Sequence, residues 1–414
     1  MTDFFNPHLT SPKFWGRNLN RQTHFDSIVG IFCFLVWVPL AVGVENNSLP
    51  PYKKMLDQPT DFSGVKDRPS PGENLPDIPI GFFAPHQASD PAGAAMWKGA
   101  TLAIDQANAR ENQSQRPFRL IARWTDNPWA AGSKEMIRLV YEDQAWAVIG
   151  SVDGEATHVA EQIVTKCRLP LLSPVCTDPT LSYIRIPWIF RLPPDDRAQA
   201  KLLVEAGIRA RGIRRVGLIT GLNHDGRIAA KEFQEALNRN ELNPVFHLNI
   251  TSATESFSEV ARKAKSFSPE ALLLGLPRQN VSRLMDSLAD SGFSCPVFIP
   301  WIPGLGVSTT GDKYAGEIIT VQPFAEDEQR PAFREFARSY RQRFGEPPDA
   351  GSAYAYDAVN LVIQGIRRAG LNRARLRDAL ANLSGYEGVT GRVVWDNGGG
   401  NPGQPTLRVM NRKQ

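Results

Sequence analysis

The sequence predicts an α/β protein of the doubly wound type, in which helices cover parallel sheets. From residue 78 onward, short apolar runs alternate with helical patterns, as βαβ units require. Between the first two runs, Trp97, Ala100, Ile104 and Ala107 recur at spacings of three and four residues, which places them on one face of a helix. The length of 414 residues exceeds what one hydrophobic core usually organises, so we expect two globular units.

The order of the expected elements follows from the same patterns. The candidate strands lie at residues 78–84, 118–124, 146–150, 170–174, 215–220, 271–275 and 296–300. Beyond Phe333 the sequence changes to successive helical segments, which we place at about 329–344, 351–370 and 373–383. Two β-like segments follow, at 391–395 and 406–410. The carboxyl-terminal part therefore adds helices and a β tail to the βα repetition.

The amino terminus carries an uncharged apolar run from Ile28 to Val44, preceded by Lys13, Arg17 and Arg21. This pattern is typical of an export signal. The run is longer than a usual secretory segment and shorter than a comfortable membrane span, so cleavage and anchoring to the inner membrane are both open. We expect residues 1–44 to be an export signal or membrane anchor. Either outcome places the rest of the chain outside the cytoplasm, because the basic flank stays inside.

The next segment and the overall charge narrow the possible partners. Residues 45–76 contain several prolines and no periodic apolar face, which indicates a linker. The 47 basic and 43 acidic residues give a formal charge of +4. These charges are spread along the chain, so we expect no nucleic-acid partner. Membrane contact is expected only through the amino-terminal segment.

The turns after the strands lack the motifs of common enzymes. Open α/β sheets bind ligands at the carboxyl ends of their strands. No GxGxxG follows a strand there, and GxxxxGK(S/T) and GxSxG are absent, which argues against dinucleotide, P-loop and α/β-hydrolase chemistry. The run Gly398–Gly400 precedes no expected helix and is typical of a loop. We therefore expect a protein that is not an enzyme and has no cofactor.

Metal binding is not indicated by the sequence either. The four cysteines include no CxxC pair, which excludes the common zinc and thioredoxin-like centres. His86, His158, His224 and His247 are far apart, with no pair at i and i+4. A metal site would need tertiary assembly of such residues, and we expect none.

Several stretches together resemble one known family. They lie at 78–107, 147–181, 190–200, 344–370 and 386–396, and include IPIGFFAPHQASDPAGAAMWKGATLAIDQANA and RLPLLSPVCTDPTL. Their order and spacing resemble the type I periplasmic solute-binding proteins, the branched-chain amino acid (Leu/Ile/Val) binding family that serves ABC importers. The resemblance runs from about Pro79 to the carboxyl terminus.

The resemblance implies a specific arrangement of the chain. Two Rossmann-like lobes with parallel sheets would be joined by a three-stranded hinge, with ligand between them and Venus-flytrap closure. Lobe 1 would comprise 77–194 and 323–399, and lobe 2 would comprise 195–322 and 400–414. The crossings would fall near Pro193–Asp196, Val321–Phe324 and Gly399–Pro402.

The family's carboxylate site in lobe 1 is altered here. In the family, a serine at a helix start and a threonine after the next strand hold the ligand carboxylate, where helix N–H groups attract an anion. The serine position falls on Gly154, which has no hydroxyl, whereas the threonine is retained as Thr177. Asp153 and Glu155 add negative charge beside it. They weaken anion binding if they face the ligand, and do not if they only complement the helix dipole at the surface.

Lobe 2 departs further from the family pattern. The closing tyrosine would fall at Asp225, a second aromatic at Pro277, and the acidic partner of the ammonium at Ile302. An acidic residue survives at the first crossing as Asp196. Because a buried ammonium without a carboxylate partner costs several kcal/mol, we expect leucine, isoleucine and valine to bind poorly.

Further side chains complete the expected site. Trp301 offers an apolar wall, and Arg278 either faces the cleft or is solvated at a helix start. His86 and His224 lie in expected cleft-edge loops and would make binding pH-dependent on contact with ligand. The candidate ligand-binding residues are Gly154, Glu155, Thr157, Cys176, Thr177, Asp196, Asp225, Arg278 and Trp301.

The sequence thus predicts an extracytoplasmic solute-binding protein. It would capture a small polar ligand, amino-acid-like, an amide or a small organic acid, and deliver it to an ABC permease in the inner membrane. The alternative is a ligand-sensing co-receptor for a signalling partner that uses the same fold. Cys167 and Cys176 would lie in an oxidising compartment, so they form either a disulfide or two small buried thiols.

Overall fold

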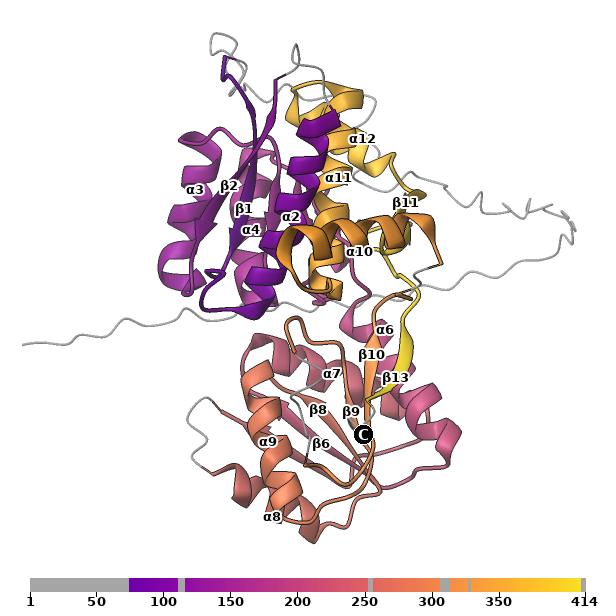
Figure 1. Ribbon diagram of the computed structural model, residues 1–414. Helices are drawn as coiled ribbons and strands as arrows, with labels where there is room; N and C mark the ends of the chain where they lie inside the picture. The colour runs from indigo at the N-terminus through magenta and orange to yellow at the C-terminus, as the bar shows by residue number, and fades with distance from the viewer. Residues whose placement is uncertain (1–73, 111–115, 252–255, 306–312, 327–328, 411–414) are drawn as a thin grey trace, which may run out of the picture. The chain divides into compact units, whose positions relative to one another are not determined.

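Two sheets organise the chain, and helices cover both faces of each (Figure 1). The structure is a computed structural model that describes residues 74–110, 116–251, 256–305, 313–326 and 329–410. The first sheet has the order β2-β1-β3-β4-β5 and is parallel throughout. The second has the order β13-β10-β9-β8-β6-β7, with β13 antiparallel to β10. The predicted doubly wound α/β class is confirmed.

The strands are short, as expected for buried parallel sheets. They are β1 (Ile78–Ala84), β2 (Phe118–Trp124), β3 (Val148–Gly150), β4 (Leu171–Ser173), β5 (Ile189–Arg191), β6 (Val216–Gly221), β7 (Phe246–Ile250), β8 (Ala271–Gly275), β9 (Val297–Ile299), β10 (Ile318–Gln322), β11 (Tyr386–Gly388), β12 (Gly391–Val393) and β13 (Thr406–Met410). β11 and β12 form a separate antiparallel pair.

The helices follow the strands in the expected alternation. They are α2 (Pro91–Arg110), η1 (Pro128–Gly132), α3 (Ser133–Tyr141), α4 (Gly154–Cys167), α5 (Thr180–Tyr183), α6 (Asp196–Leu202), η2 (Leu203–Ile208), η3 (Arg209–Arg211), α7 (His224–Arg239), α8 (Phe257–Ser266), α9 (Arg278–Asp290), α10 (Pro331–Phe344), α11 (Ala350–Ala369) and α12 (Arg373–Ala381).

The sequence patterns found most of these elements. β1, β2, β8 and β13 have the expected bounds, and the other expected strands and helices are shifted at their ends, where assignments are least sharp. The sequence patterns did not indicate β5, β7, β10 and β11. β5 has only three residues. In β7, exposed His247 and Asn249 alternate with apolar residues, because this strand lies at the sheet edge.

The first sheet buries a different core on each face. Ile80, Phe82 and Ala84 of β1 pack with α2, α10 and α11, whereas Phe83 faces the cluster formed by α3 and α4. This alternation is what the two-residue period of a strand dictates. Figure 1 shows α2 and α11 side by side on their face of the sheet.

The second sheet is built in the same way. Leu272 and Leu274 of β8 pack with α8 and α9, and Leu273 packs on the other face with α6, η2 and α7. β8 is buried along its whole length, as a central parallel strand should be. Both sheets therefore hold the loops at their strand ends on rigid layers.

The chain passes between the two sheets after β5, after β10 and before β13. Arg191, at the end of β5, is 1% exposed and its guanidinium donates to the carbonyl of Pro193 and to Asp195. Its backbone N–H donates to the Gly399 carbonyl, and its carbonyl accepts from the N–H of Asn401. Arg191 therefore ties two of these passages together.

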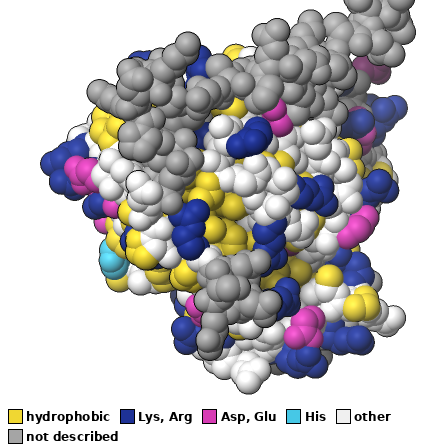
Figure 2. Space-filling view, turned by 90° about the horizontal axis from the view of Figure 1, so that it is seen from above, with side chains coloured by type: hydrophobic (Ala, Val, Ile, Leu, Met, Phe, Trp, Pro, Cys, Tyr) yellow, Lys and Arg dark blue, Asp and Glu magenta, His cyan; other side chains and the backbone are white. Residues whose placement is uncertain are grey.

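The amino-terminal segments and the surface charge bear on the expected export and partners. The apolar run at 28–44 and the linker up to residue 73 lie outside the described residues. None of the helices in the described part combines the length and apolarity that a membrane span needs. On the face shown in Figure 2, Lys and Arg side chains are dispersed among apolar and uncharged groups rather than gathered in one patch.

The disulfide alternative for Cys167 and Cys176 is wrong in this structure. Both are free thiols. Cys176 is 1% exposed, and burial raises the pKa of its thiol well above the usual range. The Cys167 sulfur lies 3.6 Å from the Tyr141 hydroxyl. The second alternative, two small buried thiols, holds for Cys176, whereas Cys167 is only partly buried.

Close packing of α2 on α11 generates a stability prediction. A Cβ added at Gly99 would lie 2.0 Å from the Ser352 carbonyl oxygen, so Gly99→Ala must push the two helices apart. We expect it to lower the free energy of unfolding by about 2 kcal/mol, as overpacked cores do. Gly351→Ala is the matched control, because its Cβ would meet atoms at 3.6 Å or more. Equal stability of the two variants in urea unfolding would refute this packing account.

A buried carboxyl predicts a pH dependence of stability. Asp357 is 0% exposed and accepts hydrogen bonds from the Val389 N–H at 2.9 Å and from the N–H and hydroxyl of Thr390 at 2.8 and 2.6 Å. Burial raises its pKa to about 6 despite these donors. The folded state therefore holds this proton more tightly than the unfolded state, whose carboxyl titrates near its ordinary value of 3.8. This contribution to stability is complete below about pH 4 and is lost as the pH rises to about 6.

We expect Asp357 alone to lower the free energy of unfolding by about 3 kcal/mol between pH 4 and pH 7. Asp357→Asn should lack this component, so the wild type should fall more steeply than the variant. Urea unfolding of both proteins at several pH values measures it. Parallel curves would show that Asp357 does not titrate in this range.

Candidate ligand-binding site

A cavity of about 600 Å³ lies between loops of the two lobes. From lobe 1 it is lined by residues that follow β1, β2, β3 and β4, and from lobe 2 by residues that follow β6, β8 and β9, together with Asp196 at the start of α6. These are the carboxyl ends of parallel strands, where open α/β sheets bind ligands. The size suits a small molecule.

Six of the nine candidate residues line this cavity. They are Gly154, Thr177, Asp196, Asp225, Arg278 and Trp301. The replaced family positions Pro277 and Ile302 also line it. Glu155, Thr157 and Cys176 are not among the lining residues. Thr157 is fully buried, and its hydroxyl donates to the Asp153 carbonyl at 2.6 Å, so it supports the helix start instead.

The cavity is strongly acidic. Its lining includes the carboxyl groups of Asp90, Asp126, Asp153, Asp196 and Asp225. Arg278 is the sole Lys or Arg among the described residues that line it. Of the two alternatives for Arg278, the structure supports the cleft-facing one, where its guanidinium lies 3.1 Å from Asp90 of the other lobe. The remaining carboxyl groups have no cationic side chain in the lining, so the cavity favours groups that donate hydrogen bonds or carry positive charge.

Burial and mutual repulsion raise the pKa of three of these carboxyl groups. Burial is the largest cause for Asp225, whose pKa rises to about 8, and the charges of Asp153 and Asp178 add to it. Burial also raises the pKa of Asp196 well above its usual range, although Thr177 donates a hydrogen bond to it. The pKa of Asp153 is raised by burial in the same way. Clustered, strongly shifted groups of this kind are typical of binding sites.

Two helix starts meet at one side of the cavity. Asp153 caps α4 by accepting from the Ala156 N–H at 2.8 Å. The Gly154 N–H donates to Asp225 Oδ1, from the first turn of α7, at 2.9 Å. A Cβ at position 154 would lie 2.5 Å from that oxygen and 2.6 Å from the His224 ring. The absence of a side chain at Gly154 is what allows α7 to approach α4.

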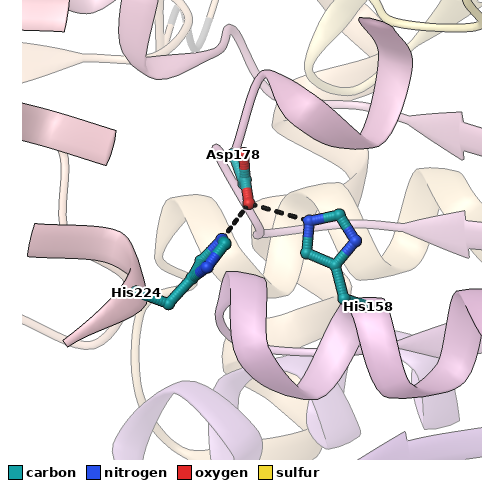
Figure 3. A group of neighbouring side chains, drawn as sticks. All are labelled: His158, Asp178 and His224. Atoms are coloured by element: carbon teal, nitrogen blue, oxygen red, sulfur yellow. Dashed lines mark hydrogen bonds and ion pairs between the residues drawn. The ribbon is translucent and has the colours of Figure 1, made fainter. Parts of the chain in front are cut away.

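A second contact between the lobes lies beside the first (Figure 3). Asp178 Oδ2 is 3.1 Å from His158 Nε2 and 2.6 Å from His224 Nε2, so the carboxylate lies between the two imidazoles. Burial disfavours a charged His158, but hydrogen bonds to Asp178 and Glu161 outweigh it and raise its pKa to about 10. Burial likewise opposes a charged Asp178, yet its hydrogen bonds to both histidines hold its pKa well below the usual range.

Trp301 provides the apolar wall that the sequence suggested. Its ring lies 5.8 Å from the ring of Tyr354 in α11, centroid to centroid. Its backbone N–H donates to the Gln199 side chain at 2.8 Å, which fixes the loop after β9. Trp301 thus contacts the core of lobe 1 from a loop of lobe 2. His86, by contrast, is not among the lining residues, and its backbone N–H donates to Asp126 Oδ1.

Sequence reasoning missed part of this arrangement. Asp90 was not singled out, although it pairs with Arg278 across 188 positions of the chain. His158 and His224 were noted only as scattered histidines, and Asp178 was not connected with them. His158 lies in α4, which follows β3, and Asp178 follows the next strand, β4, so the βα order places both near one sheet edge. That register was a usable signal.

The fold and the cavity together define a two-lobed binding protein. The family model described as "Periplasmic binding protein" matches residues 77–412. The chain therefore belongs to the periplasmic binding protein family, whose members are extracytoplasmic solute-binding proteins rather than enzymes.

Known proteins show how far the likeness extends. An "Amino acid binding protein" of Pseudomonas aeruginosa is 20% identical over 334 residues, which cover 78% of this chain and 87% of the relative. LivJ of Streptococcus pneumoniae, a branched-chain amino acid transporter substrate binding protein solved with isoleucine, is 22% identical with a TM-score of 0.72, covering 81% of this chain and 97% of that chain. A solute binding protein of an ABC transporter from R. palustris, solved with benzoate, is 17% identical with a TM-score of 0.70, covering 81% and 93%. These structural likenesses show the fold.

The meeting of α4 and α7 generates a prediction about lobe closure. Gly154→Ala places a methyl group where Asp225 and His224 now lie, so the lobes should be held further apart. We expect a larger radius of gyration in small-angle X-ray scattering, with unchanged secondary structure by circular dichroism. Glu155→Ala is the control, because it alters the same helix turn without entering the contact. Identical scattering from Gly154→Ala and the wild type would contradict the role assigned to Gly154.

Proposed function

We propose that this protein captures a small polar ligand between its two lobes and delivers it to an ABC permease in the inner membrane. Membership of the periplasmic binding protein family supports capture of a solute. The cavity is formed by both lobes, so a ligand there is fully contacted only when the lobes are together. Binding then favours the closed state by its differential contacts. The predicted export of the chain is consistent with this role.

Our proposal for the ligand class rests on the position of Asp225. A helix start binds anions through its free N–H groups and positive dipole end. At α4 a carboxyl oxygen of the protein itself, Asp225 Oδ1, accepts the hydrogen bond of the Gly154 N–H at 2.9 Å. A ligand carboxylate would have to displace Asp225 and lie beside Asp153 as well. The ligand is therefore an amine or an amide, and a small organic acid is disfavoured.

Branched-chain amino acids fit this site poorly on the same grounds. Their carboxylate meets Asp225 and Asp153, and the acidic partner of the family ammonium is replaced by Ile302. Asp196 and Asp225 offer acceptors for an ammonium or amide from other directions, and Thr177 offers a hydroxyl. Trp301 supplies an apolar surface for the rest of the ligand.

Calorimetry with a panel of amines, amides, amino acids and organic acids tests the proposed ligand class. We expect amines or amides to bind at micromolar concentration, and leucine, isoleucine and valine no tighter than about millimolar, a loss of about 4 kcal/mol. Asp225→Ala should weaken the amine or amide by about tenfold or more and strengthen carboxylates, because the Gly154 N–H is freed. Asp286→Ala, which removes an exposed carboxylate on α9, should change neither.

The two parts of the proposal fail separately. Micromolar binding of leucine that is unaffected by Asp225→Ala would refute the proposed ligand class and leave solute binding intact. Delivery is measured as uptake of the radiolabelled ligand by cells that lack the protein. Restoration of uptake by the wild type, but not by a variant that fails to bind, is the expected result, and uptake independent of the protein would refute delivery.

A further inference from the structure

Three side chains from different elements converge beside the cavity. His158 lies in α4, Asp178 follows β4, and His224 begins α7 (Figure 3). Their ligand atoms, the two Nε2 nitrogens and a carboxylate oxygen of Asp178, all lie within 4.8 Å of one another. Two of these residues belong to the part of the chain that forms the first sheet and its helices, and His224 belongs to the second.

Supporting hydrogen bonds orient these atoms toward a common point. The other oxygen of Asp178 accepts from the N–H of Thr180 at 2.8 Å and from its hydroxyl at 2.7 Å. His158 Nδ1 lies 2.5 Å from the Glu161 carboxylate. A carboxylate behind a histidine is the usual outer partner of a metal-bound imidazole. His158 Nε2 also lies 2.8 Å from the Thr180 hydroxyl. On metal binding, the ion would take the place of this hydroxyl as the partner of Nε2.

The local charge favours a cation. Asp178 and Glu161 are 1% and 4% exposed. Among the described residues, the ion pairs of these two carboxylates are with His158 and His224 alone. Glu161 Oε1 is buried without a hydrogen-bond partner. A divalent ion held by neutral imidazoles would carry two positive charges against the two buried carboxylates, so its binding would leave no net charge buried in the cluster.

We propose that His158, Asp178 and His224 bind one divalent transition-metal ion of the zinc type, and that this ion joins the two lobes. Two imidazoles and a carboxylate are ligands that zinc accepts, at about 2.0–2.2 Å, with a fourth position left for water. Tetrahedral coordination at these bond lengths separates ligand atoms by about 3.3 Å. The separations from Asp178 are now 2.6 and 3.1 Å, and all three ligand atoms lie within 4.8 Å of one another, so side-chain movements would have to bring them to this spacing.

The ion would act on closure, which goes beyond the capture of the organic ligand. His224 precedes Asp225, so an ion that holds His224 against Asp178 also holds Asp225 at the Gly154 N–H. In the closed state the ion has three protein ligands, whereas in an open state it would keep only His158 and Asp178 of lobe 1. The ion therefore stabilises closure by the difference between its affinities for these two states. Metal and organic ligand should therefore each strengthen the binding of the other.

Zinc titration of the chelator-treated full chain, without organic ligand, tests the site. We expect one Zn²⁺ per chain by competition with a chromogenic chelator, and Co²⁺ bound there should give the intense visible absorption of four-coordinate cobalt. His158→Ala and His224→Ala should each lower the affinity at least about tenfold, and Glu161→Gln by about tenfold. His247→Ala is the matched control, because His247 is exposed on β7 and bonded to Thr220, and its affinity should be unchanged.

Other outcomes overturn the proposal. Failure of the wild type to bind Zn²⁺ more tightly than the double variant His158→Ala with His224→Ala would show that the cluster is hydrogen-bonded only. Binding that all three variants retain would place the ion elsewhere. Circular dichroism and urea unfolding identify any variant that has lost its fold. Glu161→Gln keeps all three metal ligands, so its zinc affinity tests the site without removing a ligand. The binding of the organic ligand is also measured by calorimetry in the presence of chelator. Binding of the organic ligand without metal would show that solute capture holds even if the metal site does not.

Discussion

The contact between Asp225 and the amino terminus of α4 is the constraint on which the site depends. A helix start with free N–H groups is an anion site wherever it is exposed. Here a carboxyl oxygen of the protein, Asp225 Oδ1, accepts from that helix start, and Gly154 is the residue that lets it approach. The consequence is structural and chemical at once, because the same bond joins the two lobes and removes the position that a ligand carboxylate would use.

The rest of the cavity follows the same logic. Asp90 is paired with Arg278 across the lobes, and Asp178 with two histidines. The carboxyl groups of Asp196 and Asp225 remain in a partly buried cavity where burial and mutual repulsion raise their pKa. Such groups are stabilised by a donor or a cation supplied from outside. This lining is the basis of our proposal that the ligand differs in charge from the isoleucine and benzoate of the solved structures with the same fold.

The sequence predicted the fold well because buried parallel strands are nearly continuous apolar runs, as in β1 and β8. It predicted β7 and β10 poorly, since an edge strand and a strand beside a passage between the sheets carry polar residues. Gly154, Thr177 and Asp225 were found by their family positions and do line the cavity. What Asp225 contacts was not predictable, because the missing side chain at residue 154 matters only once α7 lies against α4.

The histidine cluster shows the limit of reasoning from spacing. Asp178 is 20 residues from His158 and 46 from His224; the order of strand and helix can relate the first two, but no local pattern links either of them with His224. Only the fold brings the end of β4, the body of α4 and the start of α7 together. Pairs such as Asp90 and Arg278 have the same origin. Contacts between lobes are therefore the part of this protein that sequence patterns describe least.

Identification of the molecule that the protein retains when purified from an exporting cell tests the central claim most directly. The protein would be washed, denatured, and its released small molecules analysed by mass spectrometry. The account predicts an amine or amide without a free carboxylate, which wild-type protein retains and Asp225→Ala releases. A branched-chain amino acid or an organic acid, recovered in equal amount from both proteins, would contradict it.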